Sequence, residues 1–95
     1  MTFQLLPRAR RDLENIQAWI EADSPRAAES VGRRIFQAFE LLATHPLIGH
    51  KSEHGATREW AVTGLPYIIP YRVKPDGIEI LRVFHASRRR PKRWG

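Results

Sequence analysis

The chain has 95 residues, a length that suits one domain built around a single small core. Hydrophobic residues make up 42% of it, too many for a disordered chain, and the absence of cysteine excludes disulfides and thiolate metal sites. No apolar run approaches the roughly 20 residues of a membrane helix, and the N-terminus lacks a secretion-signal pattern. We therefore expect one cytoplasmic domain over residues 1–95 that does not enter a membrane.

The formal net charge of +6 is concentrated at the C-terminus, within a basic tail that we assign to residues 86–95. Five of the six excess charges come from Arg88, Arg89, Arg90, Lys92 and Arg93, with no acidic residue among them. A compact positive segment attracts polyanions or acidic protein surfaces. The alternative is a solvated terminus that only aids solubility, and the composition favours neither reading.

The first half of the chain predicts a short strand and two helices. Residues 2–6 suit a strand that Pro7 ends, because proline lacks the N–H that a β-ladder needs. Apolar residues then recur at helical spacing, which predicts a helix from residue 7 or 8 to 22. Ser24 suits an N-cap and Pro25 the first helical position, so a second helix begins there and ends before Pro46. The two helices form an antiparallel hairpin.

The second half predicts strands after a loop at 47–57. Strands are expected at 58–63, 67–73 and 78–85, joined by turns at 64–66 and 74–77, where Gly77 would accept a positive φ. Short connections make an antiparallel meander, and one face of that sheet receives the helical hairpin, an α+β arrangement in two layers. Pro70 interrupts the middle strand, so we expect a bulge or an outward-facing position there.

Several segments, taken in order, resemble the RelE/ParE superfamily of bacterial type II toxins, and most closely the ParE branch. The strongest segment is the last hairpin, Tyr67-x-x-x-Tyr71-Arg72-Val73 followed by Ile80-Leu81-Arg82-Val83-Phe84-His85-x-x-Arg88. Others are Pro7-x-Ala9-x-x-Asp12-Leu13, Ser24-Pro25-x-Ala27-Ala28, His45-Pro46-x-Ile48-Gly49 and Arg58-Glu59.

The resemblance implies a fold in which an N-terminal strand and a helical hairpin pack on a small antiparallel sheet. It also implies a toxin that inhibits growth, stabilises plasmids in some systems, and is neutralised by a cognate antitoxin. The antitoxin's acidic, partly disordered C-terminal region folds over the toxin, and operator DNA is bound only through the toxin–antitoxin complex.

The superfamily has two modes of action, poisoning of DNA gyrase in the ParE branch and ribosome-dependent mRNA cleavage in the RelE branch. RelE-like enzymes commonly carry an arginine directly after the tyrosine that matches Tyr67, and here that position is Ile68. We therefore favour gyrase inhibition without catalysis. If the chain is an endoribonuclease, Arg82, His85 and Arg88 are the expected catalytic cluster, since cleavage needs cations and a proton-transfer group. A third alternative is an inactive protein that binds the antitoxin and helps it repress DNA.

The residues expected to contact the target or the antitoxin are basic or aromatic, and most come from the last hairpin and the tail. They are Arg58, Arg72, Arg82, His85, Arg88, Arg89, Arg90 and Trp94. Arg72 and Arg82 can line one cationic groove if the strand register allows it, or they can be surface charges paired with Glu59 or Glu79. Strand-end packing is the favoured role for His85. The spacing of His50 and His54 does not suit a metal site, and no cofactor is expected.

Overall fold

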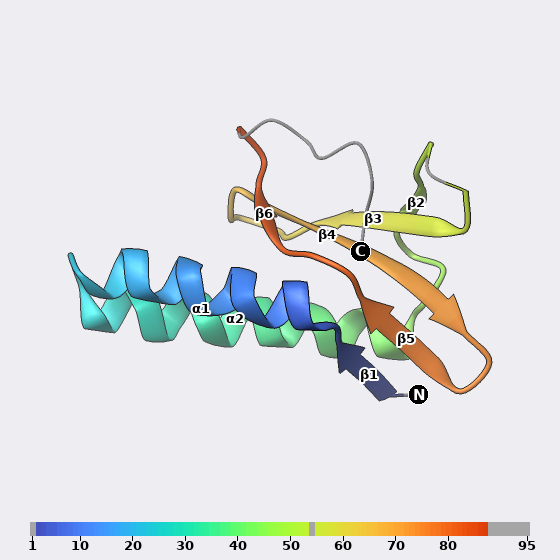
Figure 1. Cartoon of the computed structure of the whole chain (residues 1–95), viewed down its shortest axis with the longest axis horizontal. Helices are drawn as coiled ribbons and strands as arrows, with labels where there is room; N and C mark the ends of the chain where they lie inside the picture. The colour runs from blue at the N-terminus through green and yellow to red at the C-terminus, as the bar shows by residue number, and fades with distance from the viewer. Residues whose placement is uncertain (1, 54, 88–95) are drawn as a thin grey trace.

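The computed structural model describes residues 2–53 and 55–87 (Figure 1). The elements in chain order are β1 (Thr2–Leu5), α1 (Pro7–Glu21), α2 (Pro25–Thr44), β2 (His50–Lys51), β3 (Thr57–Ala61), β4 (Tyr67–Lys74), β5 (Gly77–Ile80) and β6 (Phe84–His85). The two helices lie side by side beneath the sheet and extend well past its edge (Figure 1). The predicted α+β class, with a helical hairpin packed on a small sheet, is confirmed.

The helix boundaries follow the predicted signals closely. Ser24 has an extended backbone and its Oγ accepts a hydrogen bond from the Ala27 N–H at 3.2 Å, so it is the N-cap of α2, with Pro25 at the first helical position. Helix α2 ends at Thr44, two residues before Pro46. Neither described helix is long and apolar enough to cross a membrane.

The sheet has the strand order β1-β5-β4-β3-β2, and β6 also pairs with β4. Strands β3, β4 and β5 form antiparallel neighbours, as the predicted meander requires, and β2 adds an antiparallel neighbour to β3, whereas β1 pairs with β5 in parallel. This parallel pairing explains Gly77. The structure shows no positive φ there, contrary to the sequence prediction; instead, a Cβ on Gly77 would lie 2.5 Å from the Thr2 carbonyl oxygen. The glycine lets β1 approach the sheet edge.

The strand predicted at residues 78–85 is two strands, β5 and β6, separated by residues 81–83. Tyr71 pairs with Ile80 and Ile68 with Phe84, so two residues of β4 face three residues of the other chain segment. This extra residue is a bulge, and it lies opposite Pro70, whose carbonyl oxygen accepts from the Leu81 N–H at 2.9 Å. The bulge expected at Pro70 therefore exists, but the extra residue belongs to the neighbouring segment.

The core lies between the helices and one face of the sheet. Its fully buried members include Ile35, Phe39 and Leu42 from α2, and Ile69, Tyr71 and Ile80 from the strands. Ala9 of α1 is also fully buried, which brings α1 close enough to the sheet for its polar side chains to reach the bulge. The loop predicted at 47–57 contains one short strand that sequence reasoning missed, β2.

Candidate functional site

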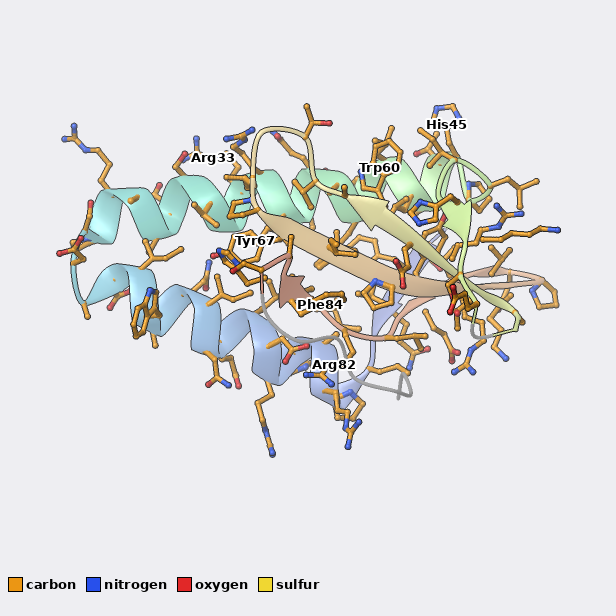
Figure 2. The ribbon with its side chains drawn as sticks, turned by 90° about the horizontal axis from the view of Figure 1, so that it is seen from above. Arg33, His45, Trp60, Tyr67, Arg82 and Phe84 are labelled. Carbon is orange, nitrogen blue, oxygen red and sulfur yellow. The ribbon has the colours of Figure 1, made fainter. Side chains whose placement is uncertain are left out.

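The first candidate region is the bulge at residues 81–83, which Asp12 of α1 connects to the helix layer. The Asp12 carboxylate accepts hydrogen bonds from Arg82 Nε at 2.8 Å, from Arg82 Nη2 at 3.2 Å and from the Val83 N–H at 2.9 Å. Figure 2 shows Arg82 extending from the bulge to the N-terminal half of α1. Because the side chains of Asp12 and Arg82 are only 16% and 22% exposed, water screens this pair weakly.

The ion pair fixes the direction of the Arg82 side chain. Hydrogen bonding to Asp12 raises the pKa of the Arg82 guanidinium further above its ordinary value. Its Nε and one Nη face the carboxylate in the bidentate manner that carboxylates and phosphates both use. The two donors of Arg82 that would bind a phosphate group side by side are therefore already bonded to Asp12.

Arg72 and Arg82 point to different partners and do not form cross-strand neighbours. Arg72 faces Glu79 in the β4–β5 register, and its Nε donates to Glu79 Oε1 at 3.1 Å. The Arg72 side chain is 39% exposed, so this pair is a partly solvated contact on the sheet. The pairing with Glu79, which the sequence left open as an alternative to a shared groove, is what the structure contains.

His85 lies at the end of β6 and packs edge-on against Tyr67, with ring centroids 5.6 Å apart. Its Nδ1 accepts from the Ser87 N–H at 3.2 Å and lies 2.7 Å from Ser87 Oγ. An Nδ1 that accepts from a backbone N–H leaves Nε2 to carry the proton of the neutral ring. His85 thus has the contacts of a strand-end packing residue. Its Nε2 is the ring nitrogen that could donate a hydrogen bond to a partner.

Arg58 holds the loop after α2. Its Nη1 donates to the Gly49 carbonyl oxygen at 2.7 Å and to that of Leu47 at 3.4 Å. Tyr71 holds the same loop from inside, donating to the Pro46 carbonyl at 2.7 Å and accepting from the Gly49 N–H at 2.9 Å. Burial raises the pKa of the Tyr71 phenol, and the Gly49 N–H and the Arg58 charge partly offset that rise.

The remaining predicted contact residues, Arg88, Arg89, Arg90 and Trp94, lie outside the described residues. Ile68 occupies β4 opposite Phe84 and is half-buried, so it belongs to the sheet.

Sequence reasoning did not assign a function to Asp12 or Tyr71, although both stand in the quoted family segments. The exposed large hydrophobic side chains were also missed as a group: Trp19, Phe36, Leu41, Leu47 and Ile48.

Leu47 and Ile48 are the two members of this set that lie in a loop and not in a helix. They are 67% and 43% exposed, yet the loop that carries them is held by Tyr71 and Arg58. A loop that exposes apolar side chains in one fixed conformation is prepared for a protein partner, because binding then orders little additional chain.

Comparison with known proteins decides the family. The sequence-family model described as the ParE toxin of type II toxin–antitoxin systems matches residues 3–90 of this chain. The chain belongs to the ParE toxin family. It is therefore the toxin of a type II toxin–antitoxin pair, and family membership implies a cognate antitoxin. The resemblance identified from the ordered motifs is confirmed.

The relatives of this ParE-family chain carry names from both branches. It is 45% identical over 85 residues to the Y4kP protein of Sinorhizobium fredii, covering 90% of this chain and 88% of that protein. It is 34% identical over 88 residues to toxin RelE3 of Caulobacter vibrioides, covering 92% and 96%. A solved chain from the chromosomal ParDE system of P. aeruginosa has the same fold, with a TM-score of 0.79, 24% identity, and coverage of 92% and 97%.

Proposed function

We propose that this toxin inhibits bacterial growth by binding and poisoning DNA gyrase, and that it catalyses no reaction itself. The observation that carries the proposal is the engagement of Arg82. An endoribonuclease needs a cation that is open to the scissile phosphate, but the Arg82 fork is bonded to Asp12 in a partly buried pair. The apolar Ile68 on the adjacent strand adds no cation to this region.

The antitoxin in this proposal binds through acidic and apolar side chains. Five large hydrophobic residues are exposed on the described surface, and a net charge of +6 favours an acidic partner. The antitoxin segment folds on binding and covers apolar surface, and the complex recruits operator DNA through the antitoxin. The toxin acts in the cytoplasm, where its target is.

The test is a pair of assays on one purified toxin preparation. We expect the toxin to block supercoiling by gyrase and to trap cleaved DNA, and to leave mRNA intact on translating ribosomes. Addition of the cognate antitoxin should restore supercoiling. Unchanged supercoiling together with ribosome-dependent mRNA cleavage would overturn the proposal.

The second candidate is a ribosome-dependent mRNA endonuclease, which the relatives named RelE favour. In this mechanism His85 transfers a proton through Nε2, and Arg82 and Arg88 stabilise the developing charge on the phosphate. His85→Gln should then abolish cleavage while the protein stays folded, and Arg72→Gln is the matched control on the sheet. Equal growth inhibition by wild type and His85→Gln would exclude this role for His85.

A further inference from the structure

A groove runs between α2 and the edge of the sheet at β3, away from the bulge and from the loop after α2. Ala38 and Leu41 of α2 form one wall, and Trp60 of β3 and Val62 directly after it form the other. Figure 2 shows Trp60 beside α2. We call this site the α2–β3 groove, and its lining residues are Arg34, Gln37, Ala38, Leu41, Trp60, Val62 and Thr63.

Strand pairing explains why the groove is open. Trp60 pairs with the core residue Ile69, and opposite residues of an antiparallel pair point to the same face, so Trp60 points toward the helices. Strand β2 pairs with β3 only at Arg58 and Glu59, so within the described sheet Trp60 lies on the outer edge. Trp60 is therefore only partly buried, although it packs against the core.

The groove suits an apolar side chain of a protein partner better than a free small molecule. Leu41 is 37% exposed, whereas Val62 is buried. The groove has a volume of about 260 Å³, which is below the roughly 300–1,000 Å³ of small-molecule pockets. A bulky apolar side chain in this space would cover Leu41 and Trp60 together, and such buried anchors supply most of the binding energy of protein interfaces.

One end of the groove carries a cation that the chain holds in place. Arg34 Nη2 donates to the Thr63 carbonyl oxygen at 2.7 Å, and a Cβ on Gly64 would lie 2.6 Å from that nitrogen, so the glycine makes room for the guanidinium. None of the described residues that line the groove is acidic, and Arg34 forms no ion pair with a described carboxylate. A guanidinium has five N–H donors, so several remain for the carboxylate of a partner.

We propose that the α2–β3 groove binds a segment of the cognate antitoxin that carries a bulky apolar side chain and a carboxylate. The apolar side chain fills the space between Leu41 and Trp60, and the carboxylate pairs with Arg34. A second copy of the toxin is the weaker fit, because each copy carries a net charge of +6 and repels another. The docking rests on the acidic and apolar antitoxin segment of the proposed function, but not on gyrase as the target.

The positions of Leu41 and Arg34 set the spacing of the two groups on the antitoxin. Both residues lie on α2, and positions 41 and 34 differ by seven, which is roughly 10 Å along the helix axis. An extended segment covers that distance in about three residues, and a helical segment in about seven. The antitoxin segment is therefore expected to carry its carboxylate at one of these two separations from its apolar anchor.

Calorimetric titration of the purified toxin with its purified cognate antitoxin tests the docking. Leu41→Ala and Arg34→Gln should each weaken binding about tenfold or more, because one removes the apolar contact and the other removes the cation. Trp19→Ala is the matched control for an exposed apolar side chain, and Arg33→Gln is the matched control for a charge on the same helix. Both controls should change the affinity less than about threefold.

Gln37→Trp covers the case in which Arg34→Gln loosens the turn at Thr63. Gln37 is exposed and lines the groove, so a tryptophan there fills the space while Arg34 keeps its bond to Thr63. This variant should also weaken antitoxin binding about tenfold, with an unchanged urea unfolding curve. In cells, each groove variant should inhibit growth as wild type does, and the antitoxin should neutralise it less well.

Four results would overturn the docking. Wild-type affinity in all three groove variants would show that the antitoxin does not use the groove. Equal losses in Arg33→Gln and Arg34→Gln would show that net charge acts without a fixed cation site. Lost growth inhibition with unchanged antitoxin affinity would assign the groove to the target, and toxin dimers that Leu41→Ala dissociates would assign it to a second copy. A negative gyrase assay changes none of these affinities, so the two proposals fail separately.

Discussion

The loop at residues 45–49 and the bulge at residues 81–83 are both irregular, but different chemistry holds each in place. The loop is held by the neutral, fully buried phenol of Tyr71, a residue of β4, through two hydrogen bonds. A charged, partly exposed carboxylate from α1 holds the bulge, and Asp12 precedes it by about 70 residues in the chain. The loop anchor stabilises the sheet edge, whereas the bulge anchor joins the helix layer to the end of the sheet that leads into the basic tail.

Gly49→Ala should have the largest effect, because the loop has no space for a side chain at this position. A Cβ there would lie 2.6 Å from Tyr71 Oη and 2.8 Å from the Glu59 carbonyl oxygen. We expect a loss of about 3 kcal/mol in the free energy of unfolding, measured by urea denaturation. Gly32→Ala is the matched control: its Cβ would meet only the end of the Gln17 side chain, so a neutral or stabilising effect is expected. Equal losses in both variants would contradict a specific constraint at the loop.

Asp12→Asn should rank second, since it leaves Arg82 partly buried without its counter-charge. The expected loss is about 2 kcal/mol in the free energy of unfolding. Faster hydrogen exchange at the Val83 amide would show that the bulge, rather than the helix alone, has loosened. Glu14→Gln on the exposed side of the same helix is the control and should change stability by less than about 0.5 kcal/mol. An unchanged Val83 exchange rate would mean that the bulge holds its conformation without Asp12.

Tyr71→Phe should lower the free energy of unfolding by about 1–2 kcal/mol, because the Pro46 carbonyl and the Gly49 N–H lose their partner.

The Tyr71 phenol should also make stability depend on pH. The pKa of Tyr71 is raised in the folded state, so the unfolded chain releases its proton first, and stability present below about pH 10 is lost as the pH rises through that region. Chemical denaturation between pH 8 and 11 should show a shallower alkaline loss in Tyr71→Phe than in wild type. Tyr67→Phe, which removes a hydroxyl from the same strand away from the loop, is the control; the same alkaline slope in all three proteins would argue against Tyr71 as its source.

Arg72→Gln should have the smallest effect, although it removes the same type of ion pair as the one at the bulge. The Arg72 side chain is 39% exposed and Glu79 is its neighbour on the next strand, so the pair is solvated and local. We expect a loss of about 0–1 kcal/mol that shrinks further in high salt. A loss equal to that of Asp12→Asn would show that burial does not distinguish the two arginines.

Local signals in the sequence predicted the helices well. Proline placement and the Ser24 cap determine where α1 and α2 begin, and apolar spacing determines which faces meet the sheet. The turns before β4 and β5 were also placed correctly, since Gly64 has a φ of +76° and Pro75-Asp76 joins two antiparallel strands. The order of the quoted sequence segments also identified the toxin family, which the match over residues 3–90 confirms.

Tertiary structure alone decided the site and the finer topology. The parallel position of β1, the placement of the bulge's extra residue in the segment opposite Pro70 and the partner of Arg82 all depend on contacts between residues far apart in the chain, for which spacing carries no signal. The quoted motifs contained Asp12 and Arg82 separately, but only the packing of α1 beneath the sheet brings that carboxylate to that guanidinium. A sequence pattern specifies which face of an element is buried, whereas the partner of a polar side chain is set by where the folded elements meet.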